Sequence, residues 1–180
     1  MKREKKEEII VLATHGAPPL DFPPHELHLY FELAWRREHG LGNISAEAEA
    51  NFSRLEEKIR RWPRHEANDP FYTGSLRLKQ ALERVAGVEV ILGFNEFCAP
   101  SVEEALEAAC SRYPQLIRVI TPMLTPGGKH AAREIPAAVL AARKKFPGIK
   151  IIYCWPFEVE EVAEFLYRAS QKDRFSPPEK

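Results

Sequence analysis

Four short runs of β-branched and apolar residues constrain the fold of this chain most strongly. They cover residues 8–14 (EIIVLAT), 87–94 (GVEVILGF), 115–121 (QLIRVIT) and 148–155 (GIKIIYCW). Runs that are apolar nearly throughout are typical of strands buried on both faces of a parallel sheet. The sequence therefore predicts four strands in a mainly parallel arrangement.

Helical patterns separate and follow these runs. Three lie between the first two strands, at about 24–39, 45–62 and 74–86, and three more follow at 101–113, 131–146 and 158–172. Ser101 and Glu104 give the fourth pattern the sequence of a capping box. Alternating strands and helices indicate an α/β fold, a four-stranded mainly parallel sheet flanked by helices. We interpret residues 20–86 as a helical insertion after strand one.

Length and composition favour a single domain. The chain has 180 residues, of which 44% are hydrophobic, enough for one core and few for two. We assign residues 1–172 to one domain and expect residues 173–180 to form a flexible tail, because they lack a packing pattern.

Charge and cysteine content exclude several classes of protein. The 26 basic and 26 acidic residues balance, and the basic ones are dispersed, which argues against nucleic-acid binding. Cys98, Cys110 and Cys154 show no CxxC spacing, so we expect small buried side chains rather than disulfides or a zinc knuckle. No apolar run is long enough for a signal peptide or a membrane span, so we expect a cytoplasmic protein with no membrane partner.

Three polar side chains follow successive predicted strands. His15 ends the first run, Glu96 follows the second and His130 follows the third. Ligands of parallel α/β sheets bind at the carboxyl ends of the strands, so these residues are expected at one edge. Two imidazoles and a carboxylate suit cobalt, nickel, iron or zinc. Each residue alone also fits a structural role: a hydrogen-bonded histidine, or a carboxylate that caps the helix after Ser101.

Other residues leave more than one interpretation open. His25 and His28, three residues apart on a predicted helix, fit either a second metal contact or an exposed helix face. Phe94 and Met123, near strand ends, fit either the core or an apolar ligand slot. Gly16, Gly127 and Gly128 would let the backbone approach a ligand closely or simply make tight turns.

Three stretches together resemble a known family. VLATHGAPP, GFNEFCAPSVEEAL and TPMLTPGGKHAAREIP resemble the class II tetrapyrrole chelatases, most closely the small CbiX-type sirohydrochlorin chelatases. The pattern of that family is a strand ending in His-Gly, a Gly-Phe-x-Glu-Phe-x-x-Pro-Ser segment and a Pro-x-x-Leu-x-x-Gly-x-His loop before Asp-Ile-Pro. This chain has Thr14 and Ala17 in the first motif, Glu134 in the last, and a longer insertion at 20–86.

The resemblance implies a fold, an activity and a set of site residues. The fold would be a chelatase-like, flavodoxin-like half, and the activity that of a lyase inserting a divalent metal substrate, cobalt or else iron or nickel, into a tetrapyrrole such as sirohydrochlorin. No tightly bound cofactor is implied. His15 would be metal ligand and proton acceptor, His130 the second ligand, and Glu96 a catalytic contact to metal or substrate. The macrocycle would be lined by Thr125, Pro126, Gly127, Gly128 and Lys129.

The resemblance also implies that the site lies between two similar domains, supplied in short members by a homodimer. Sirohydrochlorin is rich in carboxylates, so a neutral chain needs local cations, and Lys129, Arg133, Arg36 and Arg37 are candidates. The alternative is that these cations are solvated surface charges. For the chain as a whole, the alternative is a non-catalytic metal or tetrapyrrole carrier of the same fold, and a purely structural α/β protein is a more distant third.

Overall fold

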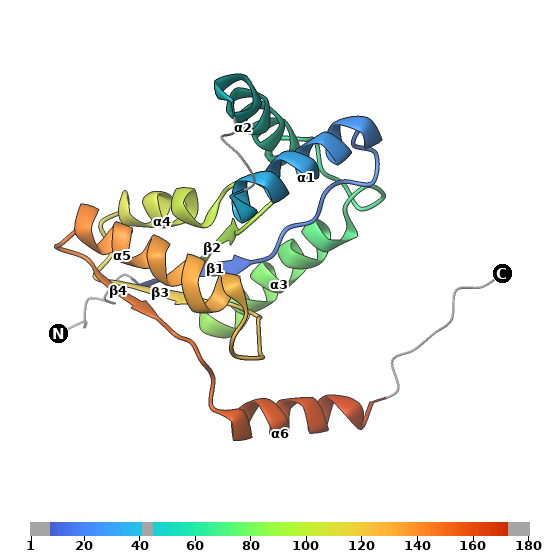
Figure 1. The fold of residues 1–180 in the computed structure, drawn as a ribbon. Coiled ribbons are helices and arrows are strands. Elements are labelled where there is room, and N and C mark those ends of the chain that lie inside the picture. The colour runs from blue at the N-terminus through green and yellow to red at the C-terminus, as the bar shows by residue number, and fades with distance from the viewer. Residues whose placement is uncertain (1–7, 41–44, 173–180) are drawn as a thin grey trace, which may run out of the picture.

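A four-stranded parallel sheet forms the centre of the molecule (Figure 1). The computed structural model describes residues 8–40 and 45–172. The strands are β1 (Glu8–Thr14), β2 (Glu89–Phe94), β3 (Leu116–Ile120) and β4 (Lys150–Tyr153), in the order β2-β1-β3-β4. The prediction of four strands in one α/β sheet is confirmed, and all of the pairings are parallel.

Helices follow in the predicted order. The first three are α1 (Pro24–His39), α2 (Ala46–Arg60) and α3 (Pro70–Ala86), all between β1 and β2. The later helices are α4 (Val102–Cys110), a π-helical turn η1 (His130–Glu134), α5 (Ile135–Lys145) and α6 (Val159–Ser170). The helical insertion after strand one is thus present, and the capping box at Ser101 and Glu104 is formed.

Two helix boundaries differ from the sequence prediction for physical reasons. Helix α3 begins at Pro70 and not at residue 74, because Asp69 caps it by accepting a hydrogen bond from the amide of Tyr72. Helix α4 ends at Cys110 rather than at residue 113, where Tyr113 adopts a φ of +53° that no α-helix can continue.

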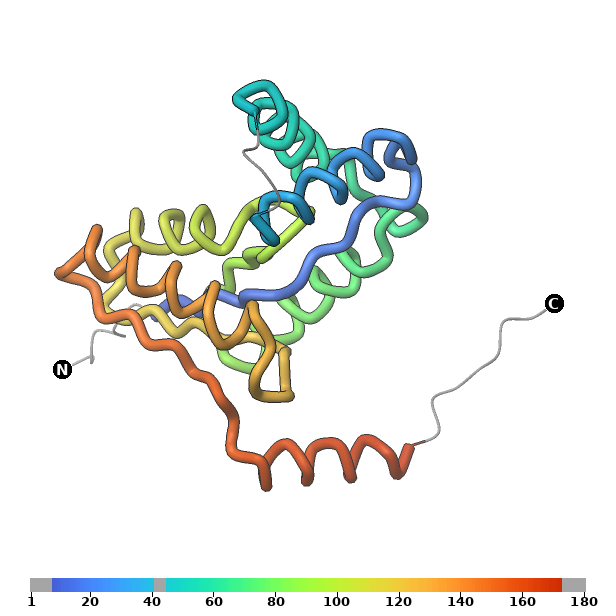
Figure 2. Tube along the Cα trace, viewed as in Figure 1, coloured from blue at the N-terminus to red at the C-terminus, as the bar shows by residue number. Residues whose placement is uncertain are grey.

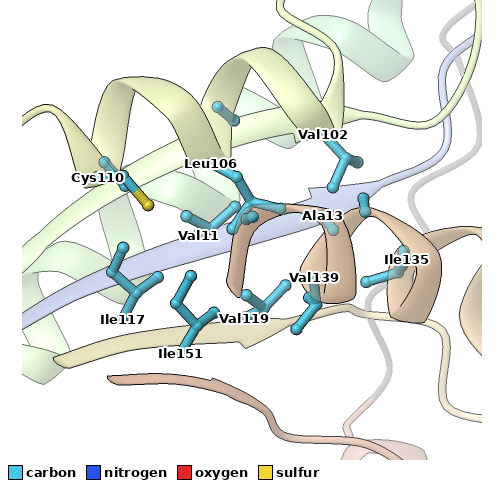
Figure 3. Packing of buried hydrophobic residues seen from close by; sticks show 14 of the residues in the cluster. Val11, Ala13, Val102, Leu106, Cys110, Ile117, Val119, Ile135, Val139 and Ile151 are labelled. Carbon is cyan, nitrogen blue, oxygen red and sulfur yellow. The ribbon is translucent and has the colours of Figure 1, made fainter. Parts of the chain in front are cut away.

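Helices α4 and α5 cover one face of the sheet, and the main core lies between these helices and the sheet (Figure 3). Every second residue of each strand points into this core, because successive side chains of a strand point to opposite faces of the sheet. The labelled members are Val11, Ala13, Val102, Leu106, Cys110, Ile117, Val119, Ile135, Val139 and Ile151. Cys98 and Cys110 are buried as predicted, whereas Cys154 is only half-buried.

The opposite face packs against α3, and α1 and α2 form a separate layer beyond the carboxyl ends of the strands (Figure 2). Ile10, Leu12 and Leu92 contact the side of α3 that carries Leu76 and Leu82. Helices α1 and α2 enclose their own cluster, which includes Phe22, Phe52 and Leu55. The insertion therefore has a small core of its own above the edge where the predicted site residues emerge.

The helix after β3 opens with a π turn because of a proline. Pro136 has no amide hydrogen and cannot donate to the carbonyl four residues earlier. The chain widens here, and the amide of Ile135 donates to the carbonyl of His130, five residues back. The first turn thus begins at His130, one residue before the predicted start, and holds that side chain on the helix rather than on a loop.

Helix α6 stands apart from the sheet at the end of an extended segment (Figure 1). The tail predicted at 173–180 lies outside the described residues. Across residues 8–40 and 45–172, no helix is long and apolar enough to cross a membrane.

Candidate metal centre

Three side chains from three strand ends converge at one point. His15 directly follows β1, Glu96 lies two residues beyond β2, and His130 starts η1. Oε1 of Glu96 lies 3.3 Å from Nδ1 of His15 and 3.5 Å from Nε2 of His130. The two imidazoles meet edge to face with ring centres 4.8 Å apart. The predicted convergence of these residues is therefore present.

The spacing of the three donor atoms suits a metal ion. One nitrogen from each histidine and one oxygen of Glu96 all lie within 4.8 Å of one another. A tetrahedral ion with bonds of about 2.1 Å has its ligand atoms roughly 3.4 Å apart. The two separations from Glu96 match that value. Among the described residues this is the one cluster of three or more such side chains, and no thiolate takes part in it.

Gly16 lets the His15 and Glu96 loops approach each other. A Cβ atom at Gly16 would overlap the carbonyl oxygen of Glu96, so no other residue fits without moving the backbone. Asn95 joins the same two loops, since its backbone and side-chain nitrogens both donate to the carbonyl of Thr14 at 2.9 Å. The His15–Glu96 pair is thus fixed by backbone contacts on both sides.

A buried arginine connects the loop that follows His15 to the loop that contains Glu96. Arg64 is only 5% exposed and forms an ion pair with Asp69, which is 1% exposed. Its guanidinium also donates to the carbonyls of Ala17 at 2.7 Å and of Phe97. Phe97 adopts a φ of +56°, an unusual conformation next to Glu96 that needs such support. Arg64 therefore ties the segment after His15 to the segment after Glu96.

Glu134 completes the surroundings of His130. In the π turn the two side chains face each other, and Nδ1 of His130 hydrogen-bonds to Oε2 of Glu134. A carboxylate only accepts, so Nδ1 carries the hydrogen and Nε2 is left to face Glu96 and a metal. This is the carboxylate–histidine arrangement that orients metal-bound imidazoles.

The local charges shift two pKa values in opposite directions. The hydrogen bond to Glu96 raises the pKa of His130 and is the largest cause of its shift. Burial lowers this pKa, but the hydrogen bond to Glu134 and the charges of both carboxylates raise it further, so the pKa of His130 stays above its usual value. Burial pushes the pKa of Glu96 upward, but hydrogen bonds and charge from His130 and His15 outweigh it and lower that pKa. The site therefore favours an ionised carboxylate between its two imidazoles.

An apolar cavity of about 760 Å³ opens beside the cluster. One wall is the start of α3, with Phe71, Gly74, Ser75 and Leu78, and the other is the 122–131 segment. His15 and His130 lie in the lining, as do Thr125, Gly128 and Lys129. Pro126 and Gly127 do not line it, and Gly127, with a φ of +102°, makes the turn. Met123 lines the cavity, whereas Phe94 is fully buried in the core.

Comparison with known proteins places the chain in a family. The model of the CbiX family matches residues 64–172, more than half of the chain. The chain belongs to the CbiX family. The matched segment includes Glu96 and His130, while His15 lies before it.

One curated relative of this CbiX chain is the sirohydrochlorin cobaltochelatase of Priestia megaterium, which is 35% identical over 78 residues. The match covers 43% of this chain and 25% of the relative, so the chain spans only a quarter of that protein.

Two solved structures are also similar. The sirohydrochlorin chelatase SirB from Bacillus subtilis subspecies spizizenii, in complex with cobalt, has a TM-score of 0.46 and 19% identity over 92% of this chain and 50% of its own. The putative cobalamin biosynthesis CbiX protein from Marinobacter aquaeolei VT8 has a TM-score of 0.43 and 13% identity over 91% of this chain and 93% of its own.

Several other candidate residues lie away from the candidate metal centre of this CbiX chain. His25 and His28 are exposed on α1 and are not part of the cluster. Arg36 and Arg37 form ion pairs with Glu32 and Glu49, and Arg133 is exposed. Lys129 is near the site, but it is paired with Glu38 at 2.9 Å and with Glu134 at 3.5 Å. The cations proposed from sequence are thus mostly paired with protein carboxylates.

Three features of the candidate site were not foreseen from the sequence. Glu134 could have been found from its spacing, because it lies four residues after His130 on a helical pattern. The α3 wall was missed because the helix was placed four residues too late, although Asp69-Pro70 is a helix-start signal. Arg64 offered no local signal, since its partners are backbone carbonyls distant in sequence.

Proposed function

We propose that this chain inserts a divalent metal ion, cobalt first and iron or nickel as alternatives, into a tetrapyrrole such as sirohydrochlorin. The observation that carries the proposal is the His15–Glu96–His130 cluster, whose two histidines line an apolar cavity of about 760 Å³. Family membership and the cobaltochelatase relative support the reaction class. The metal is a substrate in this reaction, and imidazole and carboxylate ligands would bind it transiently.

The burial and the hydrogen-bond partners of the site residues suggest different roles for them in metal binding and proton transfer. His130 and Glu96 would hold the metal, since His130 is only 19% exposed and is oriented by Glu134. His15 is 45% exposed and has one carboxylate neighbour, so it can turn toward solvent after taking a proton. We assign His15 the roles of ligand and proton acceptor.

Metal insertion must balance charge and protons. The divalent ion leaves its protein ligands for the four ring nitrogens, and two pyrrole N–H groups release one proton each. His15 accepts one proton and passes it to solvent, and Glu96 is placed to accept or relay the other once the metal has left. The α3 wall, with Phe71 and Leu78, would press on one face of the macrocycle and exclude water from the ring nitrogens.

The cavity suits the macrocycle of a tetrapyrrole better than it suits the carboxylate side chains of that macrocycle. Its lining is mainly apolar, and among the described residues that line it Lys129 is the one lysine or arginine. The acidic side chains of a tetrapyrrole would therefore lie outward, where one of them can replace Glu38 as the partner of Lys129. Thr125 and Gly128 would border the ring, and Pro126 and Gly127 would shape the loop. We also propose that residues 1–172 act as one domain and that two copies complete the cleft.

An absorbance time course tests the proposal. Purified protein is mixed with sirohydrochlorin and cobalt, then nickel and iron, beside a His130→Ala variant and a protein-free control. The proposal predicts a spectral change faster than the uncatalysed rate that ranks the metals and is lost in the variant. An unaccelerated reaction with all three metals would refute it.

A further inference from the structure

The π turn leaves the carbonyl of Ala131 without a donor from its own helix. In an α-helix that carbonyl would accept from the amide of Ile135, but this amide donates to the carbonyl of His130 instead. A further π-type bond would need the amide of Pro136, and proline has no amide hydrogen. Because Ala131 is buried, its carbonyl needs a donor from elsewhere in the protein.

A tyrosine of β4 supplies the missing donor. The hydroxyl of Tyr153, the last residue of β4, donates to the carbonyl of Ala131 at 2.9 Å. Burial raises the pKa of Tyr153 to about 12, so the hydroxyl keeps its proton at neutral pH. The ring of Tyr153 packs against the main core. Tyr153 therefore joins the turn that begins at His130 to the sheet.

A second aromatic residue holds the segment that leads to this turn. Residues 121–129 join β3 to η1 without a helix or strand of their own, so their path depends on contacts with other parts of the chain. The indole nitrogen of Trp155 donates to the carbonyl of Met123 at 3.0 Å, and its ring stacks on that of Tyr153 with ring centres 6.1 Å apart. The amide of Cys154, between these two residues, donates to a carbonyl of β3 at 2.8 Å. The aromatic pair is thus fixed to the sheet.

The segment held by this pair carries two parts of the candidate site. His130 directly precedes Ala131, and Met123 lines the cavity. A metal ligand must be held to within about 0.5 Å of its working position, and groups that do not touch the metal orient it. Neither Tyr153 nor Trp155 belongs to the metal cluster or to the cavity lining. Their influence on the site therefore passes through the backbone carbonyls that accept from them.

We propose that Tyr153 and Trp155 are positioning residues of the site: Tyr153 directs His130 toward Glu96, and Trp155 fixes the cavity wall at Met123. The inference rests on the proposed function, because it takes His130 as a metal ligand and the cavity as the place of the macrocycle. Without the Tyr153 hydroxyl, a buried carbonyl of the turn would lack a donor. The turn would then relax to satisfy that carbonyl, and the imidazole would move with it.

Cobalt binding tests the role of Tyr153. Tyr153→Phe, made in the full chain, removes one oxygen atom and keeps the ring. It should weaken cobalt binding about tenfold by calorimetry, the lower end of the loss when a group that supports a ligand is removed. It should also change the visible absorption spectrum of bound cobalt, which reports coordination geometry.

Tyr113→Phe is the matched control for this variant, because the side chain of Tyr113 is 82% exposed. It should leave both the affinity and the spectrum unchanged. If Tyr153→Phe lowered the thermal stability of the protein but kept wild-type cobalt affinity and spectrum, the role of Tyr153 would be purely structural and the assignment would be overturned.

Tetrapyrrole binding tests the role of Trp155. Trp155→Phe keeps an aromatic ring but loses the donor to Met123, so it should weaken sirohydrochlorin binding by about three- to tenfold in a fluorescence titration and change cobalt affinity less than about twofold. Trp62→Phe, which loses an indole hydrogen bond to Asp21 outside the cavity, should leave tetrapyrrole binding unchanged. Unaltered tetrapyrrole binding in Trp155→Phe would refute its role.

The same measurements separate this inference from the proposed function. A wild-type protein that binds cobalt and sirohydrochlorin but does not accelerate metal insertion would refute the proposed function alone, because both positioning roles are measured by binding. A wild-type protein that binds no cobalt would refute both the proposed function and the role of Tyr153.

Discussion

His15 and His130 reach the same carboxylate from very different settings. His15 directly follows β1, is nearly half exposed, and is paired with Glu96. His130 begins a π turn, is mostly buried, and lies between Glu96 and Glu134. A metal-holding group benefits from rigidity, whereas a proton acceptor must exchange with solvent. Under the proposed function, this difference would divide metal binding and proton transfer between two identical side chains of one cluster.

The largest effect is expected at the exposed histidine. His15→Ala should lower the rate of metal insertion by about 10²–10⁴-fold, the usual contribution of a positioned proton acceptor. Cobalt should still bind, more weakly, through Glu96 and His130. Initial rates and calorimetric cobalt binding measure both quantities, with His25→Ala, an exposed histidine on α1, as the control. An unchanged rate would remove the proton-acceptor role.

The buried histidine should dominate metal affinity. His130→Ala is expected to weaken cobalt binding by more than about a hundredfold, since loss of an orienting partner alone costs 10–100-fold. The same calorimetric titration should rank this variant below His15→Ala. If His15→Ala lost more affinity than His130→Ala, the division of roles would be reversed.

The partner of His130 is expected to contribute less. Glu134→Gln should weaken cobalt binding by roughly tenfold, because Gln can still accept from Nδ1 but carries no charge. It should also lower the pKa of His130 from its raised value, which NMR titration of the imidazole can follow. Glu134→Asp, the residue of the family motif, serves as the conservative variant and should restore most of the affinity. An unaltered His130 titration would show that Glu134 does not act on the imidazole.

The raised pKa of His130 predicts two opposite pH trends. Cobalt must displace the proton of His130, so affinity should rise by up to about tenfold per pH unit until that pKa is passed. The stabilising effect of protonated His130 on the metal-free fold is complete below its unfolded pKa and is lost as pH rises through the folded pKa. Calorimetry and thermal unfolding across pH should therefore move in opposite directions, and parallel trends would contradict this assignment.

The smallest effect is expected at the exposed ion pair between Glu38 and Lys129. Glu38→Gln removes one of the two carboxylate partners of Lys129 and leaves Glu134 as the other. A substrate carboxylate can take the place of Glu38, so tetrapyrrole binding should tighten by about two- to fivefold at low salt, since exposed pairs are weak and screened. Glu32→Gln, which removes an equal charge from the same helix, is the control. Tighter binding that persisted at high salt would point to another cause.

The sequence predicted the sheet and the cluster because both depend on local patterns. Apolar runs marked the strands, and parallel strands bring the residues that follow them, His15, Glu96 and His130, to one edge. The remainder depends on contacts between distant segments. Arg64 acts through carbonyls at Ala17 and Phe97, and the approach of Gly16 to Glu96 joins positions 80 residues apart.

The central claim is catalysis by this cluster, and counting products tests it most directly. The amount of metallated tetrapyrrole formed per chain is measured with cobalt and sirohydrochlorin in large excess, beside His15→Ala. We predict many equivalents per chain for the wild-type protein at a rate above the uncatalysed one, and near-background formation for the variant. Formation that stops at one equivalent per chain would contradict catalysis and identify a carrier of metal or tetrapyrrole.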